Sequence, residues 1–432
     1  MTQPQTDGKT SKVPRSPLSA ATLALICGGM ILTLALGIRH GFGLFLQPMS
    51  LANGWGREVF GLSVALSNLI WGVAQPFTGM LADRIGARRV LIAGGTLFCA
   101  GLAGMAHSTQ PWHLVLSIGV LVGVGMSCCT FNIVLSALGR LSPPEKRSKV
   151  FGAASSAGSL GQFLLMPMVA VLIGSIGWYW ALVALAVAVA MVVPLSAGIR
   201  DKGYGSSLNA DGTPQTGLVS TREAVCAAAT NRNFWLLGLG YFTCGFQVVF
   251  IGTHFPAYVV DKGLTAFDGT VALALIGFFN IFGSYYAGVL GQRFHKTYLL
   301  AIAYLSRSVL IVLMLSFPLT PWSVYLFAMG LGITWLATVP LTSGVVAGIW
   351  GVRHMAMLTG MVFLFHQVGS FFGGWLGGLI FDRTGSYDLV WWIAIGLGLT
   401  AALINLPIDE RPAQPRDAVP GAVAGATRAT AG

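Results

Sequence analysis

The chain has 432 residues, of which 55% are hydrophobic and only 9% are charged, and its mean hydropathy is +0.74. This composition excludes an ordinary soluble enzyme and predicts an all-α polytopic membrane protein. The formal net charge of +11 would suggest nucleic acid in a soluble chain, but Lys and Arg here lie in short breaks between apolar runs. We therefore expect no nucleic-acid partner and interpret the basic residues as signals for membrane orientation.

Twelve apolar stretches reach the length of about 20 residues that a helix needs to cross a bilayer. They divide into an N-terminal six-helix bundle at 20–197 and a C-terminal six-helix bundle at 234–407. We expect a cytoplasmic N-terminal tail at 1–19, a cytoplasmic linker rich in Gly, Ser and Thr at 198–233, and a disordered cytoplasmic tail at 408–432. The predicted spans are 20–49, 57–81, 88–107, 111–139, 148–173, 177–197, 234–260, 267–291, 297–317, 321–349, 354–380 and 387–407.

The distribution of Lys and Arg predicts the orientation. With both termini inside, 20 of the 25 basic residues lie on the cytoplasmic side, three lie outside, and Arg39 and Arg307 lie within spans. Cytoplasmic loops carry such an excess of positive charge. The chain is therefore expected in the cytoplasmic (inner) membrane as a multi-pass protein with both termini in the cytoplasm.

The two halves of the chain are related in sequence. A shift of 208 residues places Pro48 on Pro256 and Gly161 on Gly369, and a shift of 209 places Gly79 on Gly288. This repeat predicts two bundles related by an axis along the membrane normal, with a site between them near the midplane, as in transporters.

Arg39 is an unusual residue of the first span, because no charged residue precedes it between Ala20 and Ile38. A central Arg costs about 2.5 to 3.5 kcal/mol to insert, and no carboxylate on the same helix offsets that cost. The simplest compensation is a water-filled cavity and an anion that visits it. The alternative is that the side chain extends to the outer interface, where its charge is hydrated.

Several other polar residues lie within spans. By the shift of 208, Gln247 matches Arg39, so we expect it to face the same cavity, and His254 shares its helix face. His366 and Gln367, in the eleventh span, are candidate substrate-binding residues, and His366 is also the candidate for proton coupling because histidine titrates near neutral pH. The remaining amides either line the pathway or join helices to one another; they are Asn132, Gln162 and Asn280.

Arg307, in the ninth span, is the other cation within the membrane. By repeat symmetry its helix is peripheral, so we expect it to bond to a backbone carbonyl or a lipid phosphate. The cysteines Cys27, Cys99, Cys128, Cys129 and Cys244 lie in apolar runs and Cys226 in the linker, with no metal-binding spacing, so they are interpreted as small buried hydrophobic residues.

The loop after the second span reads Gly79-Met80-Leu81-Ala82-Asp83-Arg84-Ile85-Gly86-Ala87-Arg88-Arg89. It resembles the signature G-x-x-x-D-R-x-G-x-R-R of the major facilitator superfamily at every defined position. We expect a conformational latch that breaks when the two halves rock, formed by Gly79, Asp83, Arg84, Gly86, Arg88 and Arg89. An orientation signal alone would explain only Arg88 and Arg89. In the second-half copy, Gln292 stands where the acid would be, which predicts a weaker latch there.

A finer resemblance covers most of the predicted membrane part. Arg39-His40-Gly41-Phe42-Gly43, the run from Lys146 to Gly158, and the runs His366–Gly374 and Phe381–Tyr387 resemble the monocarboxylate transporter and oxalate/formate exchanger branch. The resemblance implies that Arg39 contributes to a substrate anion's site. One feature departs from animal-type members, which carry an Asp and Arg pair on the eighth span: residues Val271 to Leu290 include no ionisable side chain except Tyr285 and Tyr286.

Together these patterns predict a secondary active transporter, not an enzyme, that moves a small organic anion, with a monocarboxylate and proton symport favoured. The expected partners are that anion, protons and the lipid bilayer; no cofactor, metal or obligate protein partner is expected, and the protein is expected to be a monomer. One alternative is an exporter of drugs or apolar metabolites, which a lone intramembrane cation fits poorly. A membrane sensor built on a transporter fold and a membrane enzyme are further alternatives, but the chain has neither a large soluble domain nor a catalytic motif.

Overall fold

The computed structural model describes residues 20–55, 57–201, 203 and 220–412. Within these residues every regular element is a helix. The predicted tail at 1–19, most of the predicted tail at 408–432 and part of the predicted linker lie outside the described residues.

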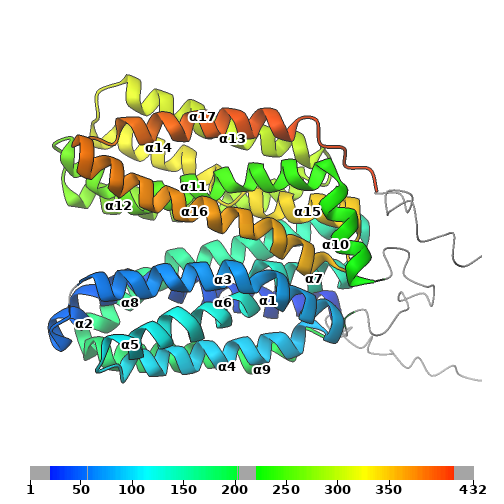
Figure 1. Cartoon of the computed structure of the whole chain (residues 1–432), viewed down its shortest axis with the longest axis horizontal. Coiled ribbons are helices and arrows are strands. Elements are labelled where there is room, and N and C mark those ends of the chain that lie inside the picture. The colour runs from blue at the N-terminus through cyan, green and yellow to red at the C-terminus, as the bar shows by residue number, and fades with distance from the viewer. Residues whose placement is uncertain (1–19, 56, 202, 204–219, 413–432) are drawn as a thin grey trace, which may run out of the picture.

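The helices form two bundles that lie side by side, one from each half of the chain (Figure 1). The N-terminal bundle contains α1 (Ala20–His40), η1 (Gly41–Phe45), α2 (Leu46–Asn53), α3 (Arg57–Ile85), α4 (Ala87–Ala106), α5 (Pro111–Leu114), η2 (Val115–Val122), α6 (Gly123–Cys129), α7 (Phe131–Leu141), η3 (Pro144–Lys146), α8 (Arg147–Ala190) and α9 (Val192–Ser196).

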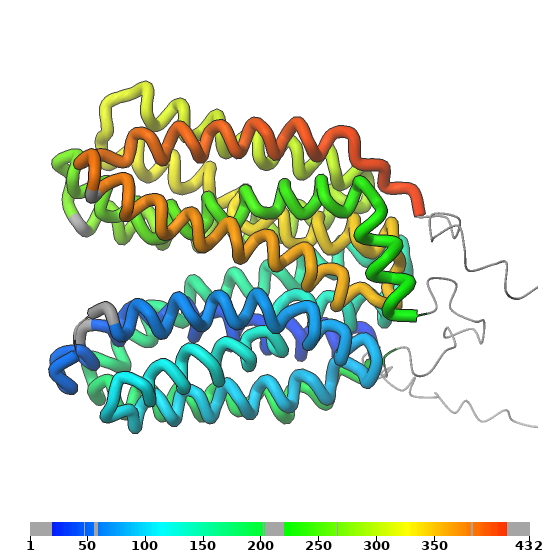
Figure 2. Tube along the Cα trace, viewed as in Figure 1, coloured from blue at the N-terminus to red at the C-terminus, as the bar shows by residue number. Residues whose placement is uncertain are grey.

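The C-terminal bundle follows the same plan. It contains α10 (Thr221–Thr230), α11 (Arg232–Asp261), α12 (Ala266–Leu290), α13 (Lys296–Ser316), α14 (Pro321–Thr334), α15 (Thr338–Trp350), α16 (Met355–Thr384) and α17 (Asp388–Asn405). Helix α10 falls within the predicted linker and begins at a capping box in which Ser220 and Glu223 bond to each other's backbone N–H groups. The described chain enters and leaves the two bundles at the same end (Figure 2).

Among the described residues, eleven helical stretches are long and apolar enough to cross a membrane. One of them, Pro144–Ser196, has 53 residues, which would span about 80 Å as one straight helix, more than twice the bilayer core. Gly177 divides it, because its φ of 79° and ψ of 163° are not helical and glycine alone adopts them readily. The stretch therefore crosses twice, and the prediction of twelve membrane helices in two six-helix bundles is confirmed.

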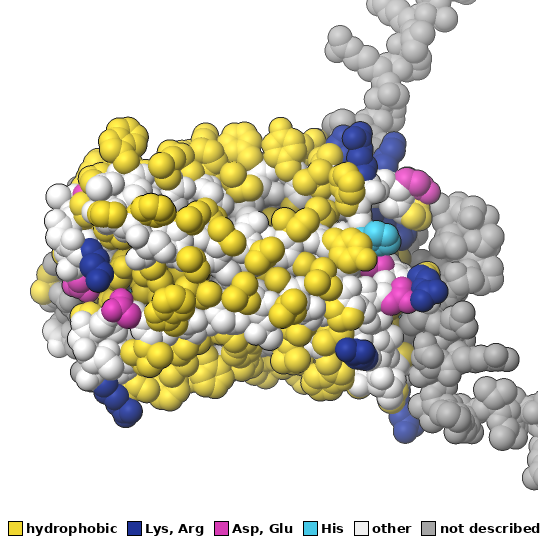
Figure 3. All heavy atoms as spheres, turned by 90° about the horizontal axis from the view of Figure 1, so that it is seen from above, with side chains coloured by type: hydrophobic (Ala, Val, Ile, Leu, Met, Phe, Trp, Pro, Cys, Tyr) yellow, Lys and Arg dark blue, Asp and Glu magenta, His cyan; other side chains and the backbone are white. Residues whose placement is uncertain are grey.

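The lateral surface is apolar and the charges gather at the two ends (Figure 3). Large hydrophobic side chains stay exposed there, for example Phe77, Leu326 and Leu403, each more than 60% exposed. Because a soluble protein rarely exposes so much contiguous apolar surface, this band is the face that contacts lipid.

Two membrane helices are interrupted at corresponding places. The fourth span breaks at Thr130, between α6 and α7, and the tenth breaks between Thr334 and Thr338, where α14 gives way to α15. Backbone groups freed at membrane depth need partners inside the protein. Side chains provide them: Gln75 donates to Ser127 O at 2.8 Å in the first break, and Asn280 Oδ1 accepts from Leu336 N at 2.9 Å in the second.

The two halves contact each other along two helix pairs, α3 with α16 and α8 with α12. A Cβ on Gly152 would lie 2.7 Å from Gly288 Cα, and a Cβ on Gly79 would overlap the Ala356 carbonyl, so glycine permits both approaches. These glycines lie near the end where α3 stops and α4 begins, which we call the latch end. In Figure 1 the halves converge at this end, beside α7 and α10, and diverge at the opposite end.

Helix packing within the N-terminal half supplies a test of the fold. A Cβ on Gly161 of α8 would overlap the carbonyl of Thr33 on α1, whereas a Cβ on Gly174 of the same helix would meet no atom within 4 Å. We expect Gly161→Ala to lower the free energy of unfolding by about 1 to 3 kcal/mol through overpacking. The matched control Gly174→Ala should leave it unchanged or raise it by up to about 1 kcal/mol. Thermal unfolding in detergent checks this, and equal midpoints for the two variants would contradict the α1–α8 packing.

Candidate functional site

Arg39 lies in the last turn of α1 and points toward α3. Its Nη2 donates to Asn68 Oδ1 at 2.6 Å, and its guanidinium carbon lies 5.5 Å from the centre of the Phe42 ring. Its Nε is buried without a hydrogen-bond partner. No carboxylate among the described residues forms an ion pair with it. A half-buried positive charge therefore lies in the N-terminal bundle with a neutral amide as its hydrogen-bond acceptor.

Asn68 connects this guanidinium to the other half of the molecule. Its backbone oxygen accepts from Gln367 Nε2 on α16 at 3.0 Å. Close approach is possible because position 72 is glycine: a Cβ there would lie 2.7 Å from the Cβ of Gln367. Arg39, Asn68 and Gln367 thus form a continuous polar chain across the interface between the bundles.

His366 extends this chain into the C-terminal bundle. Its Nδ1 lies 3.3 Å from Gln367 Oε1 and 3.4 Å from Ser370 Oγ, and its ring stacks on Phe363 with centroids 5.1 Å apart. The Tyr241 ring is 4.9 Å away, and the imidazole is 9% exposed. An imidazole can donate or accept a proton at either nitrogen, so this position suits proton transfer between the two halves.

Gln247 and His254 lie elsewhere. Gln247 is 1% exposed and donates to Ala394 O on α17 at 3.0 Å, so the expected pairing with Arg39 across one cavity is absent from this conformation. Repeat symmetry matches backbone positions, but here the amide packs within its own bundle. His254 Nε2 lies 2.9 Å from Gly374 O, which ties α11 to α16 inside the C-terminal half.

The other predicted amides also differ in their surroundings. Asn280 is fully buried and holds the break between α14 and α15, so of its two predicted roles the structure shows the joining of helices. Asn132 follows the break at Thr130 and its Nδ2 is buried without a partner, while Gln162 on α8 is 8% exposed. Contact of Asn132 and Gln162 with substrate stays a prediction.

A buried charge cluster occupies the latch end. Arg140 of α7 donates to Asp83 Oδ1 at 2.6 Å and, through Nε and Nη2, to both oxygens of Asp201 at 3.0 and 2.7 Å. Asp83 also accepts from the N–H groups of Ala356 and Met357 at 3.2 and 2.9 Å, at the start of α16 in the other half. The positive end of the α16 dipole therefore joins Arg140 in stabilising the Asp83 carboxylate, and the carboxylate connects the halves.

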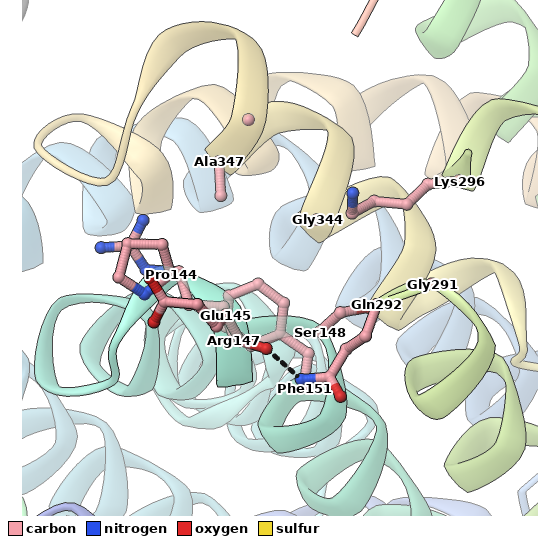
Figure 4. A pocket seen from close by; sticks show the side chains of 11 residues that line it. Pro144, Glu145, Arg147, Ser148, Phe151, Gly291, Gln292, Lys296, Gly344 and Ala347 are labelled. Carbon is pink, nitrogen blue, oxygen red and sulfur yellow. Dashed lines mark hydrogen bonds between the residues drawn. The ribbon is translucent and has the colours of Figure 1, made fainter. Parts of the chain in front are cut away.

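The remaining residues of the predicted latch surround this cluster. Gly86 turns the chain between α3 and α4 with a φ of 92°, and Arg84 donates to Thr221 Oγ1 of α10 at 2.9 Å. Arg88 and Arg89 are exposed. In the second-half copy, Gln292 Nε2 donates to Glu145 O at 2.6 Å across the interface, beside a cavity of about 200 Å³ between the halves (Figure 4).

Sequence reasoning missed three residues of these sites. Asn68 is an amide near the middle of an apolar span, the same signal that drew attention to Asn132. Arg140 is one of the Lys and Arg residues that indicate orientation, and Asp201 has no distinguishing sequence signal. Only folding brings these two residues, in the last turn of α7 and after α9, to Asp83. Among the residues that the structure describes, no group of three or more His, Cys, Asp or Glu is arranged to hold a metal ion.

The charge cluster predicts a conformational effect. Asp83→Asn keeps the side-chain volume but removes the charge that the α16 N–H groups and Arg140 stabilise. Hydrogen bonds to charged groups contribute about 1.5 to 3 kcal/mol, so we expect the population closed at the latch end to fall roughly ten- to hundredfold relative to the open one. Distances between spin labels at the exposed positions 88 and 293, in a background without other cysteines, measure this ratio.

The matched control is Gln292→Ala, which removes a single neutral hydrogen bond across the same interface. It should shift the distance distribution far less than Asp83→Asn. Equal shifts for the two variants would show that the Asp83 charge has no special role in closure.

Comparison with known proteins gives consistent results. The model of the Major Facilitator Superfamily matches residues 18–343. The chain is 24% identical over 395 residues to the uncharacterized MFS-type transporter YcxA of Bacillus subtilis, covering 87% of this chain and 92% of YcxA. It is 26% identical over 360 residues to monocarboxylate transporter 11 of Mus musculus, covering 80% and 78% of the two chains. The crystal structure of the E. coli fucose:proton symporter FucP superposes with a TM-score of 0.67 at 15% identity, covering 89% of this chain and 97% of FucP.

Proposed function

Because the chain belongs to the Major Facilitator Superfamily, we propose that this transporter moves a small organic anion, a monocarboxylate, together with a proton by alternating access. The observation that carries the proposal is the Arg39 guanidinium, which lies inside the bundle with a neutral amide as its hydrogen-bond acceptor. A carboxylate forms two parallel hydrogen bonds with a guanidinium, each stronger than a bond to an amide. A bound carboxylate would therefore stabilise the Arg39 guanidinium more than the Asn68 amide does.

Binding at Arg39 is linked to the interface between the halves. A carboxylate on the guanidinium competes with Asn68 Oδ1, and the Asn68 backbone is held by Gln367 of the other half. Substrate binding therefore alters a contact that must change when the halves rock. In alternating access, the two bundles close at one end of the molecule while the binding site is open to the other end.

In this conformation, hydrogen bonds between the halves lie from Asn68 toward the latch end, and they include those of Asp83, Ser156 and Gln292. The excess of Lys and Arg supports a cytoplasmic latch end. With that orientation, the conformation is the one that receives substrate from outside. Loss of the Asp83 bonds to α16 accompanies the opposite state.

The relatives support the substrate class. The mouse relative is a monocarboxylate transporter by name, and the FucP structure is that of a proton symporter. His366 is joined to Arg39 by three contacts, through Gln367 and Asn68, which places an imidazole that can carry a proton on the same polar chain as the anion site.

Uptake of labelled lactate, pyruvate and related acids into proteoliposomes, with and without an inward proton gradient, tests this function. We expect Arg39→Gln to reduce acid uptake at least about tenfold, since one charged hydrogen bond is worth about 1.5 to 3 kcal/mol. Arg39→Lys keeps the charge without the bidentate geometry and should give an intermediate rate. The control Arg222→Gln, at an exposed position of α10 outside the predicted latch, should transport like wild type. Robust acid uptake by all three variants would exclude Arg39 as the anion site.

Asn68 offers a second, electrostatic test. Asn68→Asp places a carboxylate where the amide now accepts from Arg39 at 2.6 Å, so it should compete with substrate and raise the KM for the acid about tenfold or more. Asn68→Ala removes the competing acceptor without adding charge and should change KM much less. Equal KM values for the Asp and Ala variants would contradict a carboxylate site at Arg39.

A further inference from the structure

Arg307 of α13 is a second guanidinium inside the membrane part, and it is 1% exposed. Its Nη2 donates to the carbonyls of Thr334 and Trp335, where α14 and α15 meet, the second at 2.7 Å. Its Nη1 lies 3.4 Å from Gln247 Oε1 and 3.6 Å from Cys244 Sγ, both on α11. The expected bond to backbone carbonyls is present, and the residue lies fully inside the C-terminal bundle.

These partners leave the charge of Arg307 without an obvious counter-ion. Burying a cation is costly unless an anion lies beside it. No carboxylate among the described residues forms an ion pair with Arg307, and its Nε is buried without a partner. Carbonyls and the Gln247 amide supply dipoles but no charge. Of the atoms that accept hydrogen bonds from Arg307, the Cys244 sulfur alone can become negative.

Cys244 is set apart from the other cysteines by its polar contacts. It is fully buried, yet its sulfur lies 3.2 Å from Thr338 Oγ1 of α15 and 3.6 Å from Arg307 Nη1, and the His366 imidazole of α16 is an electrostatic neighbour. Thiolates form where Arg and imidazole groups surround the sulfur. The interpretation of Cys244 as a merely hydrophobic residue is therefore incomplete.

The ionisable groups around this sulfur come from three helices. They are Tyr241 of α11 itself, Arg307 and Tyr304 of α13, and His366 of α16. The Arg307 guanidinium also lies 5.6 Å from the centre of the Tyr304 ring. Each of these groups is neutral or positive at neutral pH, so the sulfur is the place for the compensating negative charge.

A continuous series of contacts joins this cluster to the anion site. Cys244 has His366 as an electrostatic neighbour, His366 contacts Gln367, and Gln367 bonds to Asn68, which accepts from Arg39. One guanidinium therefore lies at each end of a polar chain that crosses between the bundles.

We propose that Cys244 and Arg307 form the proton-binding pair of this transporter, with the Cys244 thiolate paired to Arg307 in the empty protein and protonated when an anion binds at Arg39. The inference rests on the proposed function. Protonation forms the S–H bond with a proton that comes from water through the imidazole of His366, and release returns it by the same route. No electron transfer is involved.

The charges balance in this scheme. In the empty state Arg39 and Arg307 carry two positive charges and the thiolate one negative charge. In the loaded state the thiol is neutral and the bound carboxylate supplies the negative charge instead. The empty and the loaded states therefore have the same net charge when one proton accompanies one monocarboxylate. Neither state pays an extra cost for moving charge through the apolar bundle when the halves rock.

Ultraviolet absorbance of the thiolate tests the pair without any substrate. In a protein whose other five cysteines are replaced by Ser, we expect thiolate absorbance at neutral pH that disappears on acidification. Arg307→Gln in this background should lose the absorbance at neutral pH, and Arg307→Lys, which keeps the charge and serves if the Gln variant does not fold, should retain at least part of it. No thiolate at neutral pH, or a thiolate indifferent to the Gln replacement, would overturn the pairing.

Flux measurements test the coupling. For one proton per acid, an inward gradient of one pH unit drives up to about tenfold accumulation. Cys244→Ser, which keeps the size but does not ionise, should abolish this gradient-driven accumulation, and Cys244→Asp, which restores an acid, should recover it with its pH profile moved to lower pH. His366→Gln should slow the response to an imposed gradient, and the control Cys99→Ser should behave like wild type. Gradient-driven accumulation by the Ser variant equal to wild type would overturn the inference.

The two sets of results separate the inference from the function on which it rests. If the wild-type protein moves no acid but Cys244 is a thiolate that depends on Arg307, the anion-transport proposal fails and the charge pair stands. If the protein moves acid and the Cys244→Ser variant still follows the proton gradient, the transport proposal stands and the coupling role of Cys244 fails.

Discussion

The structure depends on how positive charge is accommodated in an apolar bundle that offers it no carboxylate. Arg39 and Arg307 each lie within a membrane helix, and each hydrogen-bonds to neutral acceptors among the described residues. Hydrogen bonds to amides and carbonyls reduce the cost of burial but do not cancel the charge. An anion that binds and leaves is a natural complement for Arg39, and an ionisable sulfur is one for Arg307. In our proposal, this difference in counter-charge assigns the anion to Arg39 and the proton to the Cys244–Arg307 pair.

The same charges are placed where the halves meet. Along α3, the contacts with α16 run from Asn68 and Gln367 to Asp83 and the first N–H groups of α16, so the proposed anion site and the charge cluster share one pair of helices. Glycines let these helices, and α8 with α12, approach closely enough for backbone and side chain to meet. One helix pair thus holds the proposed binding site midway along its length and a charged contact at one end. Such a pair is suited to couple binding at the site to closure at that end. The second pair is bridged near the latch end by Gln292 rather than by an acid, and the weaker latch expected there stays a prediction.

Interrupted helices explain why several polar residues occur inside spans. The breaks at Thr130 and between α14 and α15 free backbone groups, and Gln75, Asn280 and Arg307 bond to them. Such breaks supply irregular backbone near the centre of the membrane, which is tolerated only where protein surrounds it. A polar residue within a span therefore indicates either an interrupted helix or a substrate pathway. Hydropathy alone does not distinguish these two cases.

The sequence alone determined the class of fold, because the length of apolar runs, the internal repeat and the loop motif depend on local composition and spacing. Twelve crossings and two bundles followed from those patterns, and the same patterns singled out Arg39 and Asp83 as candidates, since a charge in an apolar run needs compensation wherever the run folds. The tertiary structure alone decided which polar groups meet. Asn68 turned out to face Arg39, Arg140 and Asp201 to join Asp83, and Gln247 to pack against Arg307 rather than across from Arg39. The reason is that partners on different helices are chosen by the rotation and tilt of each helix, and these arise from packing among all of its neighbours rather than from the residues of that helix.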